Sequence, residues 1–223
     1  MEQYLRLNTL KTMIRHRYPY IWDCCCDHGL LGISLLDDDL ADQVHFVDQV
    51  DTLIASLDEK LSDQYANSRW KTHCIDMAQL NLTRTEGSDE PAHLMVIAGV
   101  GGDLLIELVK AILVNNPDLP VEFILCPVRQ NYQVRQALIE ADMSLIDEKL
   151  VKEKGLYYEV LHVSSEGGVP ISSVGSLMWD FTEEAHRIYL KRTLEHYQRR
   201  LRGNPQEVTP IIQQYTALLD SFA

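Results

Sequence analysis

The sequence predicts an α/β fold in which a doubly wound, largely parallel sheet ends in an antiparallel hairpin and is followed by two helices. Short apolar runs alternate with helical periods up to residue 140, which is typical of a parallel sheet with helices on both faces. Residues 143–165 then hold two alternating segments joined through Glu153-Lys154-Gly155, which indicates a β-hairpin.

The individual elements follow from these patterns in order. Helical periods cover residues 2–16, 30–40, 51–64, 103–116 and 131–142. Apolar runs that we expect to form strands cover residues 20–26, 43–50, 70–76, 92–98 and 121–128.

A break rich in Gly and Ser at 165–176 precedes two further helices, at 181–203 and 204–222. Asn204 is the expected N-cap of the second one, and Pro205 lies in its first turn. We therefore expect a domain at 1–165, with an N-terminal helix at 1–17, and a C-terminal helical appendage at 176–223.

The charge is acidic overall but unevenly distributed. The chain has 223 residues and a formal net charge of -13, which is the wrong sign for a protein that contacts many phosphates. Both ends are nevertheless locally basic, because 1–22 carries four basic residues against one acidic, and 183–202 carries six against three. Two interpretations stay open: nucleic-acid contacts, or ordinary solvated helix faces.

The five cysteines favour free thiols. Three of them are adjacent, at Cys24, Cys25 and Cys26, and neighbouring residues on a strand point to opposite faces, so they do not bridge easily. No pair has the spacing of a zinc site. We expect no metal and a reducing compartment. No apolar run is long enough to cross a bilayer, and the N-terminus does not have the pattern of a signal peptide, so a cytoplasmic protein is expected.

Acidic residues stand where the predicted strands end. Ligands of open α/β sheets bind at these carboxyl ends. Asp48 lies about twenty residues after the first loop, the usual place of a carboxylate that accepts both ribose hydroxyls. Asp76 ends the third strand and either accepts an adenine amine or caps the following segment.

Glycines follow the fourth strand in the segment "AGVGG". They allow close approach of a ligand to the backbone, but the segment lacks the Lys-Ser/Thr of a phosphate-binding P-loop. The next residue, Asp103, is expected to cap its helix.

Longer motifs resemble one family. The pattern of Asp23, Asp27 and His28, the segment "MVIAGVGGDLLIELV" and the segment "FILCPVRQNYQVRQALIEADMSLIDEKLVKEKGLYYEVLHV" are similar to the bacterial tRNA (adenine(22)-N(1))-methyltransferases, or TrmK family. The resemblance covers most of the chain. It implies the Rossmann-like fold of class I methyltransferases, S-adenosylmethionine as methyl donor, a tRNA adenine N1 as acceptor, and a helical C-terminal appendage. We expect a monomer.

The same resemblance implies roles for individual residues. Asp27 would be the catalytic residue. The donor would be bound by Asp23, Cys25, His28, Asp48, Gln49, Asp76, Met77 and Gly99. The tRNA would be bound by Gly101, Gly102, Pro127, Arg15 and Arg192, the two arginines holding phosphates.

Two positions depart from the family pattern. The family has glycine at the position of Cys25, and Gln-Pro-Asn where this chain has Cys126-Pro127-Val128. Two alternatives to the tRNA methyltransferase therefore stay open. One is a catalytically impaired module that keeps the fold and binds RNA or protein, and the other is a small-molecule methyltransferase.

Overall fold

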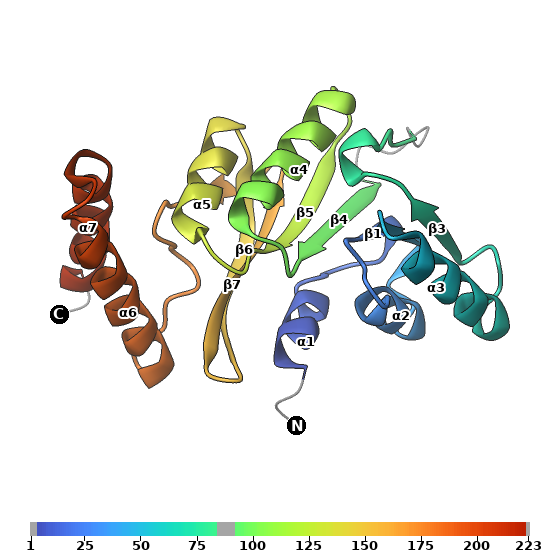
Figure 1. Cartoon of the computed structure of the whole chain (residues 1–223), viewed down its shortest axis with the longest axis horizontal. Helices are drawn as coiled ribbons and strands as arrows, with labels where there is room; N and C mark the ends of the chain where they lie inside the picture. The colour runs from blue at the N-terminus through green and yellow to red at the C-terminus, as the bar shows by residue number, and fades with distance from the viewer. Residues whose placement is uncertain (1–3, 84–91, 222–223) are drawn as a thin grey trace.

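The computed structural model describes residues 4–83 and 92–221 and contains one eight-stranded sheet (Figure 1). The strand order is β3-β2-β1-β4-β5-β7-β6-β8. The strands are β1 (Tyr18–Cys24), β2 (Ala41–Asp48), β3 (Trp70–Cys74), β4 (His93–Ala98), β5 (Val121–Cys126), β6 (Ser144–Glu153), β7 (Leu156–Ser164) and β8 (Val169–Pro170).

The strand pairing confirms the predicted topology. Strands β1 to β5 pair in parallel, and β7 inserts antiparallel between β5 and β6. The hairpin turns at Lys154 and Gly155, which both have positive φ. The short strand β8 was not predicted. It lies in the Gly/Ser-rich break and pairs with the start of β6.

Helices cover both faces of the sheet, as Figure 1 shows, and alternate strand residues supply two separate cores. The helices α1 (Leu5–Thr12), α2 (Leu30–Asp37) and α3 (Asp51–Gln64) pack on one face, against side chains such as Phe46 and Val96. On the other face lie α4 (Gly102–Asn115), α5 (Asn131–Glu140) and the 3-10 helix η1 (Met77–Gln79). The central strands β4 and β5 are therefore buried along nearly their whole length, as a sheet covered on both faces requires.

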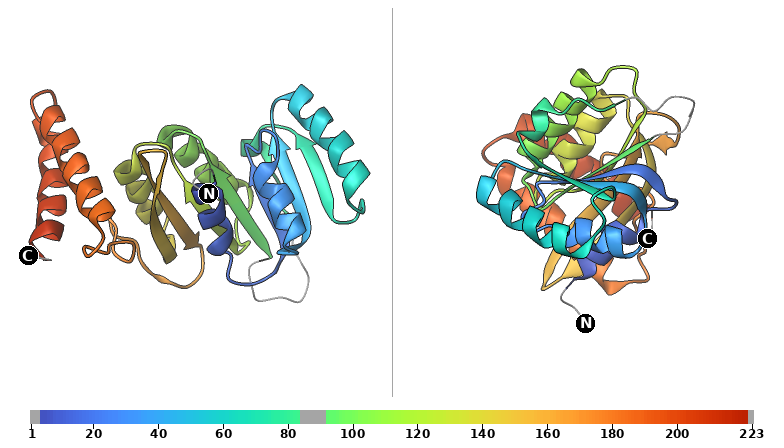
Figure 2. Two further views of the ribbon diagram at one scale, coloured as in Figure 1. Left: turned by 90° about the horizontal axis from the view of Figure 1, so that it is seen from below. Right: turned by 90° about the vertical axis from the view of Figure 1, so that its right-hand side faces the viewer.

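The two last helices, α6 (Glu184–Arg200) and α7 (Pro205–Asp220), stand beside the β6–β7 end of the sheet (Figures 1 and 2). Asn204 caps α7 as predicted, because its side-chain oxygen accepts the N–H of Glu207 at 3.4 Å. A third core, which includes Trp179, Leu190 and Tyr215, joins α6, α7 and the preceding linker. The domain boundaries at 165 and 176 stay a prediction.

The predicted helix ends at residues 2 and 222 lie outside the described residues. Within the described ranges, none of the helices combines the length and apolarity that a bilayer crossing requires.

Candidate functional site

Two cavities open at the carboxyl ends of the parallel strands. The larger, of about 340 Å³, lies between the loop after β1 and the loop after β4, and its lining includes Asp23, Asp27, His28 and Gly99. The smaller, of about 260 Å³, is lined by Asp48, Gln49, Met77 and apolar side chains. Cys25 lines both cavities, so a ligand that spans them has to pass this side chain.

The loop after β1 has an unusual backbone. Cys25, Asp27 and Gly29 all have positive φ, at 56°, 51° and 67°. Such angles favour glycine, and a non-glycine residue there needs outside support. Two hydrogen bonds provide it, since the N–H of Cys26 donates to Val47 O at 3.1 Å and that of Asp27 to Asp48 Oδ2 at 3.1 Å. The loop therefore holds a glycine-like path with a cysteine in it.

Asp23 forms the floor of the larger cavity. It is 5% exposed, and its Oδ2 accepts the N–H of Gly32 at 2.8 Å. Burial raises the pKa of Asp23 to about 7, and the nearby carboxylate of Asp48 adds to the shift, while the hydrogen bond from Gly32 opposes it. A cationic group in the cavity would therefore favour the ionised form of Asp23.

Asp27 and His28 lie at the mouth of the larger cavity. Both side chains are largely exposed, at 70% and 73%, and Asp27 Oδ1 lies 3.5 Å from His28 Nε2. Asp48, at the end of β2, accepts two backbone N–H groups, from Asp27 and from Val50, each at 3.1 Å. A carboxylate has further acceptor sites beyond these two. The predicted residues Asp23, Cys25, Asp27, His28 and Gly99 are thus brought together in one cavity, and Asp48, Gln49 and Met77 in its neighbour.

Asp76 is not among the residues that line either cavity. Its Oδ1 accepts the N–H of Ala78 at 2.9 Å, which caps η1. The capping interpretation of Asp76 is therefore confirmed, and a contact to adenine stays a prediction.

The prediction that Asp103 caps α4 is wrong. The N-cap is Gly101, and Asp103 lies in the first turn. Gln130 takes the capping role across space, because its Oε1 accepts the N–H of Asp103 at 3.2 Å while its amide donates to Asp103 Oδ2 at 2.7 Å. A cap supplied from another loop leaves no mark in the local sequence.

The residues predicted to bind tRNA are dispersed. Gly101 and Gly102 pack against the segment after β5, since a Cβ on Gly102 would lie 2.7 Å from Arg129 O. Pro127, which directly follows β5, is buried. Arg15 forms an ion pair with Asp147 at 3.1 Å and lines neither cavity. Arg192 lies on α6, at a third cavity between that helix and the segment after β5.

Arg6 is a site residue that sequence reasoning missed. It reaches the larger cavity from α1, with its guanidinium 4.8 Å from the ring centre of Tyr158. Its Nε is buried and has no hydrogen-bond partner among the described residues. A buried donor without a partner is costly, so its presence at a cavity wall fits a ligand with an acceptor group. The nearest signal in the sequence is its place in a helix rich in basic residues.

The three adjacent cysteines are buried or half-buried, whereas Cys74 is exposed. Cys24 and Cys26 are buried, and Cys25 is half-buried. Burial raises the pKa of the Cys25 thiol to about 11, and the carboxylates of Asp48 and Asp23 add to the shift, so the thiol is neutral at physiological pH. Within the part of the chain that is described, no group of three or more potential metal ligands comes together.

One protein-family model, described as "Methyltransferase domain", matches residues 4–161. No curated protein sequence matches the chain significantly.

Solved structures are similar over nearly the whole length. TrmK of M. capricolum, in complex with S-adenosyl-homocysteine, has a TM-score of 0.75 at 14% identity and covers 99% of each chain. The M1A22 tRNA methyltransferase TrmK of B. subtilis has a TM-score of 0.72 at 18% identity and covers 97% of each chain. Magnesium protoporphyrin IX methyltransferase from Synechocystis PCC 6803 reaches 0.55 at 13% identity and covers 72% of this chain and 80% of its own.

Proposed function

The chain belongs to the methyltransferase domain family, and on that premise we propose that it transfers a methyl group from S-adenosylmethionine to N1 of an adenine in tRNA. The observation that carries this proposal is the pair of cavities at the strand ends, which meet at Cys25. One cavity has charged side chains, as the charged methionine end of this donor requires, and the other is mostly apolar with one carboxylate, as its adenosine end requires.

The larger cavity suits the methionine end of the donor. Asp23 would accept the ammonium group, and the buried, unpartnered Nε of Arg6 would donate to the carboxylate. Gly99, at φ 83°, has open space around a notional Cβ, so the backbone there leaves room for the methyl group and its acceptor.

The smaller cavity suits the adenosine end. The carboxylate of Asp48 would accept the ribose hydroxyls, and Met77, Val47 and Leu108 would pack on the adenine ring. S-adenosylmethionine, when bound, supplies a methyl group activated by a sulfonium.

Asp27 is the group best placed to act on the acceptor. Adenine N1 carries a lone pair that can attack the methyl carbon directly, and the product is a cation shared with the exocyclic amine. The carboxylate of Asp27, at the mouth of the larger cavity, would stabilise this developing charge and accept a proton from the amine. The base would reach the cavity by leaving its stack.

The full-length fold similarity supports tRNA as acceptor over a small molecule. The TrmK structures cover nearly the whole chain, whereas the porphyrin methyltransferase covers 72% of it. An RNA substrate is also large enough to contact the C-terminal helices.

The test is methylation of an unmodified tRNA transcript, read as 1-methyladenosine by nucleoside mass spectrometry. Asp27→Asn should lower the rate of methylation by about 100-fold or more. The amide carries no negative charge to stabilise the developing cation and cannot accept the proton of the exocyclic amine. Binding of S-adenosylhomocysteine, measured by titration calorimetry, should change little. Asp63→Asn, an exposed change on α3, is the matched control and should leave both readouts unchanged.

The catalytically impaired module is the second candidate, and the observation that favours it is the thiol of Cys25 between the two cavities. It predicts no titratable binding of donor or S-adenosylhomocysteine. Binding of the donor without any 1-methyladenosine would instead point to another acceptor and refute the adenine N1 assignment.

A further inference from the structure

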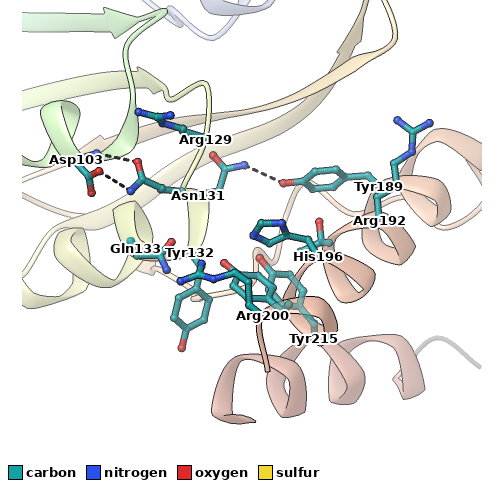
Figure 3. A pocket seen from close by; sticks show the side chains of 13 residues that line it. Asp103, Arg129, Asn131, Tyr132, Gln133, Tyr189, Arg192, His196, Arg200 and Tyr215 are labelled. Atoms are coloured by element: carbon teal, nitrogen blue, oxygen red, sulfur yellow. Dashed lines mark hydrogen bonds between the residues drawn. The ribbon is translucent and has the colours of Figure 1, made fainter. Parts of the chain in front are cut away.

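A third cavity, of about 590 Å³, lies between the segment that follows β5 and the helix α6 (Figure 3). Arg129 lines it from the first side, Arg192, His196 and Arg200 from α6, and Tyr215 from α7. Figure 3 shows His196, Arg200 and Tyr215 facing the segment after β5, while the side chain of Arg192 extends outward from α6 at the edge of the cavity, where its guanidinium lies 5.4 Å from the ring centre of Tyr157. The sequence places them some 60 residues apart, so only the fold creates this site.

The cavity is cationic in an acidic protein. Three arginines line it against one acidic residue, Asp103, whose carboxylate already accepts a hydrogen bond from Gln130. Arg129 and Arg192 form no ion pair with any described residue, and Arg200 lies 3.7 Å from Glu207. The pKa of His196 is lowered by burial and by the positive charges of Arg200 and Arg199. In a chain of net charge -13, two arginines without an acidic partner beside a third one fit an anionic ligand.

The cationic cavity adjoins the cavity of about 340 Å³ at the strand ends, which is the larger of the two that we assign to the donor. Val100 lines the latter, and its carbonyl accepts the N–H of Val128, the residue before Arg129. A Cβ on Gly101 would lie 3.3 Å from Arg129 Nε, so the Arg129 side chain rests against the backbone that follows Val100. A polymer with one unit in the larger cavity therefore has Arg129 beside it and the α6 arginines beyond.

We propose that this cavity binds backbone phosphates of the RNA next to the nucleotide that is methylated. Arg129 and Arg192 contact the phosphate oxygens, because a planar guanidinium presents paired N–H donors that match them. Asn131 and Gln133, which also line the cavity, provide amides for the sugar and for non-bridging oxygens. The inference rests on the proposed function, because it takes the methyl acceptor to be an RNA.

Arginine variants in the full-length protein test the proposal. Arg129→Ala, Arg192→Ala and the double variant are compared with Lys191→Ala, which removes a positive charge from an exposed position of α6 that does not line the cavity. The readouts are fluorescence anisotropy with labelled tRNA and calorimetry with S-adenosylhomocysteine.

We expect each arginine variant to bind tRNA about 10-fold more weakly and the double variant about 100-fold, since hydrogen bonds to charged groups are the strong ones. Lys191→Ala should stay within about twofold of the wild type, and S-adenosylhomocysteine binding should be unchanged in all of them. The proposal is overturned if the arginine variants bind tRNA as tightly as Lys191→Ala does. If tRNA is not methylated but its binding still weakens in the Arg129 and Arg192 variants, the proposed function is refuted while the phosphate contacts of this cavity stand.

Discussion

At the scale of single residues, Cys25 lies where the two strand-end cavities meet. Its φ of 56° lies in the left-handed region, which costs a non-glycine residue on the order of 1 kcal/mol. The hydrogen bonds of Cys26 and Asp27 to β2 hold the loop in this conformation. Cys25 therefore follows a backbone path that favours glycine, and its side chain narrows the passage between the two cavities.

Cys25→Gly separates volume from backbone strain. We expect S-adenosylhomocysteine to bind about 10-fold more tightly, because the thiol leaves the passage and glycine adopts positive φ freely. Cys25→Ala is the control: it removes the sulfur and keeps the Cβ and most of the strain, so it should recover only part of the gain. Titration calorimetry gives both affinities. If glycine and cysteine bind the ligand equally, the thiol does not obstruct the site.

At the scale of elements, buried charges attach the C-terminal helices to the sheet. Arg135 of α5 donates to Glu148 of β6 at 2.5 Å and to Glu159 of β7 at 2.8 Å, and all three side chains are fully buried. Glu148 Oε1 also accepts the N–H groups of Ser176 and Leu177, each at 2.5 Å, and Glu159 accepts the hydroxyl of Tyr189 at 2.6 Å. The same carboxylates thus bind the linker and α6, which fixes one wall of the cationic cavity.

Arg135→Met should destabilise the protein by about 3–5 kcal/mol, because it leaves two carboxylates buried without their counter-charge. Lys110→Met is the matched control. Lys110 lies 4.0 Å from Glu140 at an exposed position, so its loss should cost less than about 0.5 kcal/mol. Urea unfolding followed by circular dichroism gives the two free energies. Equal stability of the two variants would show that the buried cluster does not hold the elements together.

The secondary-structure elements could be predicted from the sequence more completely than the roles of individual polar residues. The strands and α3 followed from local periodicity, which sets the buried faces of a sheet and of a helix. The roles of Asp103 and Arg135 depend on partners in other elements, Gln130 and Glu148, that periodicity does not reveal. That the strand-end residues lie close together could be predicted from the sequence, but only by way of the predicted topology, because parallel strands bring their carboxyl ends to one edge of the sheet.

At the scale of the whole molecule, the two basic ends of the chain differ in how many of their positive charges form ion pairs. Near the N-terminus, Lys11 pairs with Asp38 at 2.7 Å, Arg15 with Asp147 at 3.1 Å, and Arg17 with Asp42 at 3.0 Å. Of these three, only Lys11 lies on the helix α1, and all three basic residues are neutralised by acidic neighbours, which disfavours phosphate contacts at this end. At the other end, Arg192 and Arg199 of α6 and the following Arg202 form no ion pair with a described residue, so positive charge without an acidic partner is concentrated on and just after α6.

This distribution predicts a weak salt dependence of tRNA binding. Three arginines line the cationic cavity, and each phosphate contact on single-stranded RNA contributes about 0.7 to the slope of log affinity against log salt, so we expect a slope of about -2. The acidic remainder of the molecule repels RNA, and salt screens that repulsion as well, which flattens the slope further. Anisotropy titrations from about 50 to 300 mM KCl measure this slope. In the Arg129→Ala, Arg192→Ala double variant the magnitude of this slope should fall by about 1.4, because two phosphate contacts are lost. A slope steeper than about -6 that the double variant leaves unchanged would place the phosphate contacts elsewhere on the molecule.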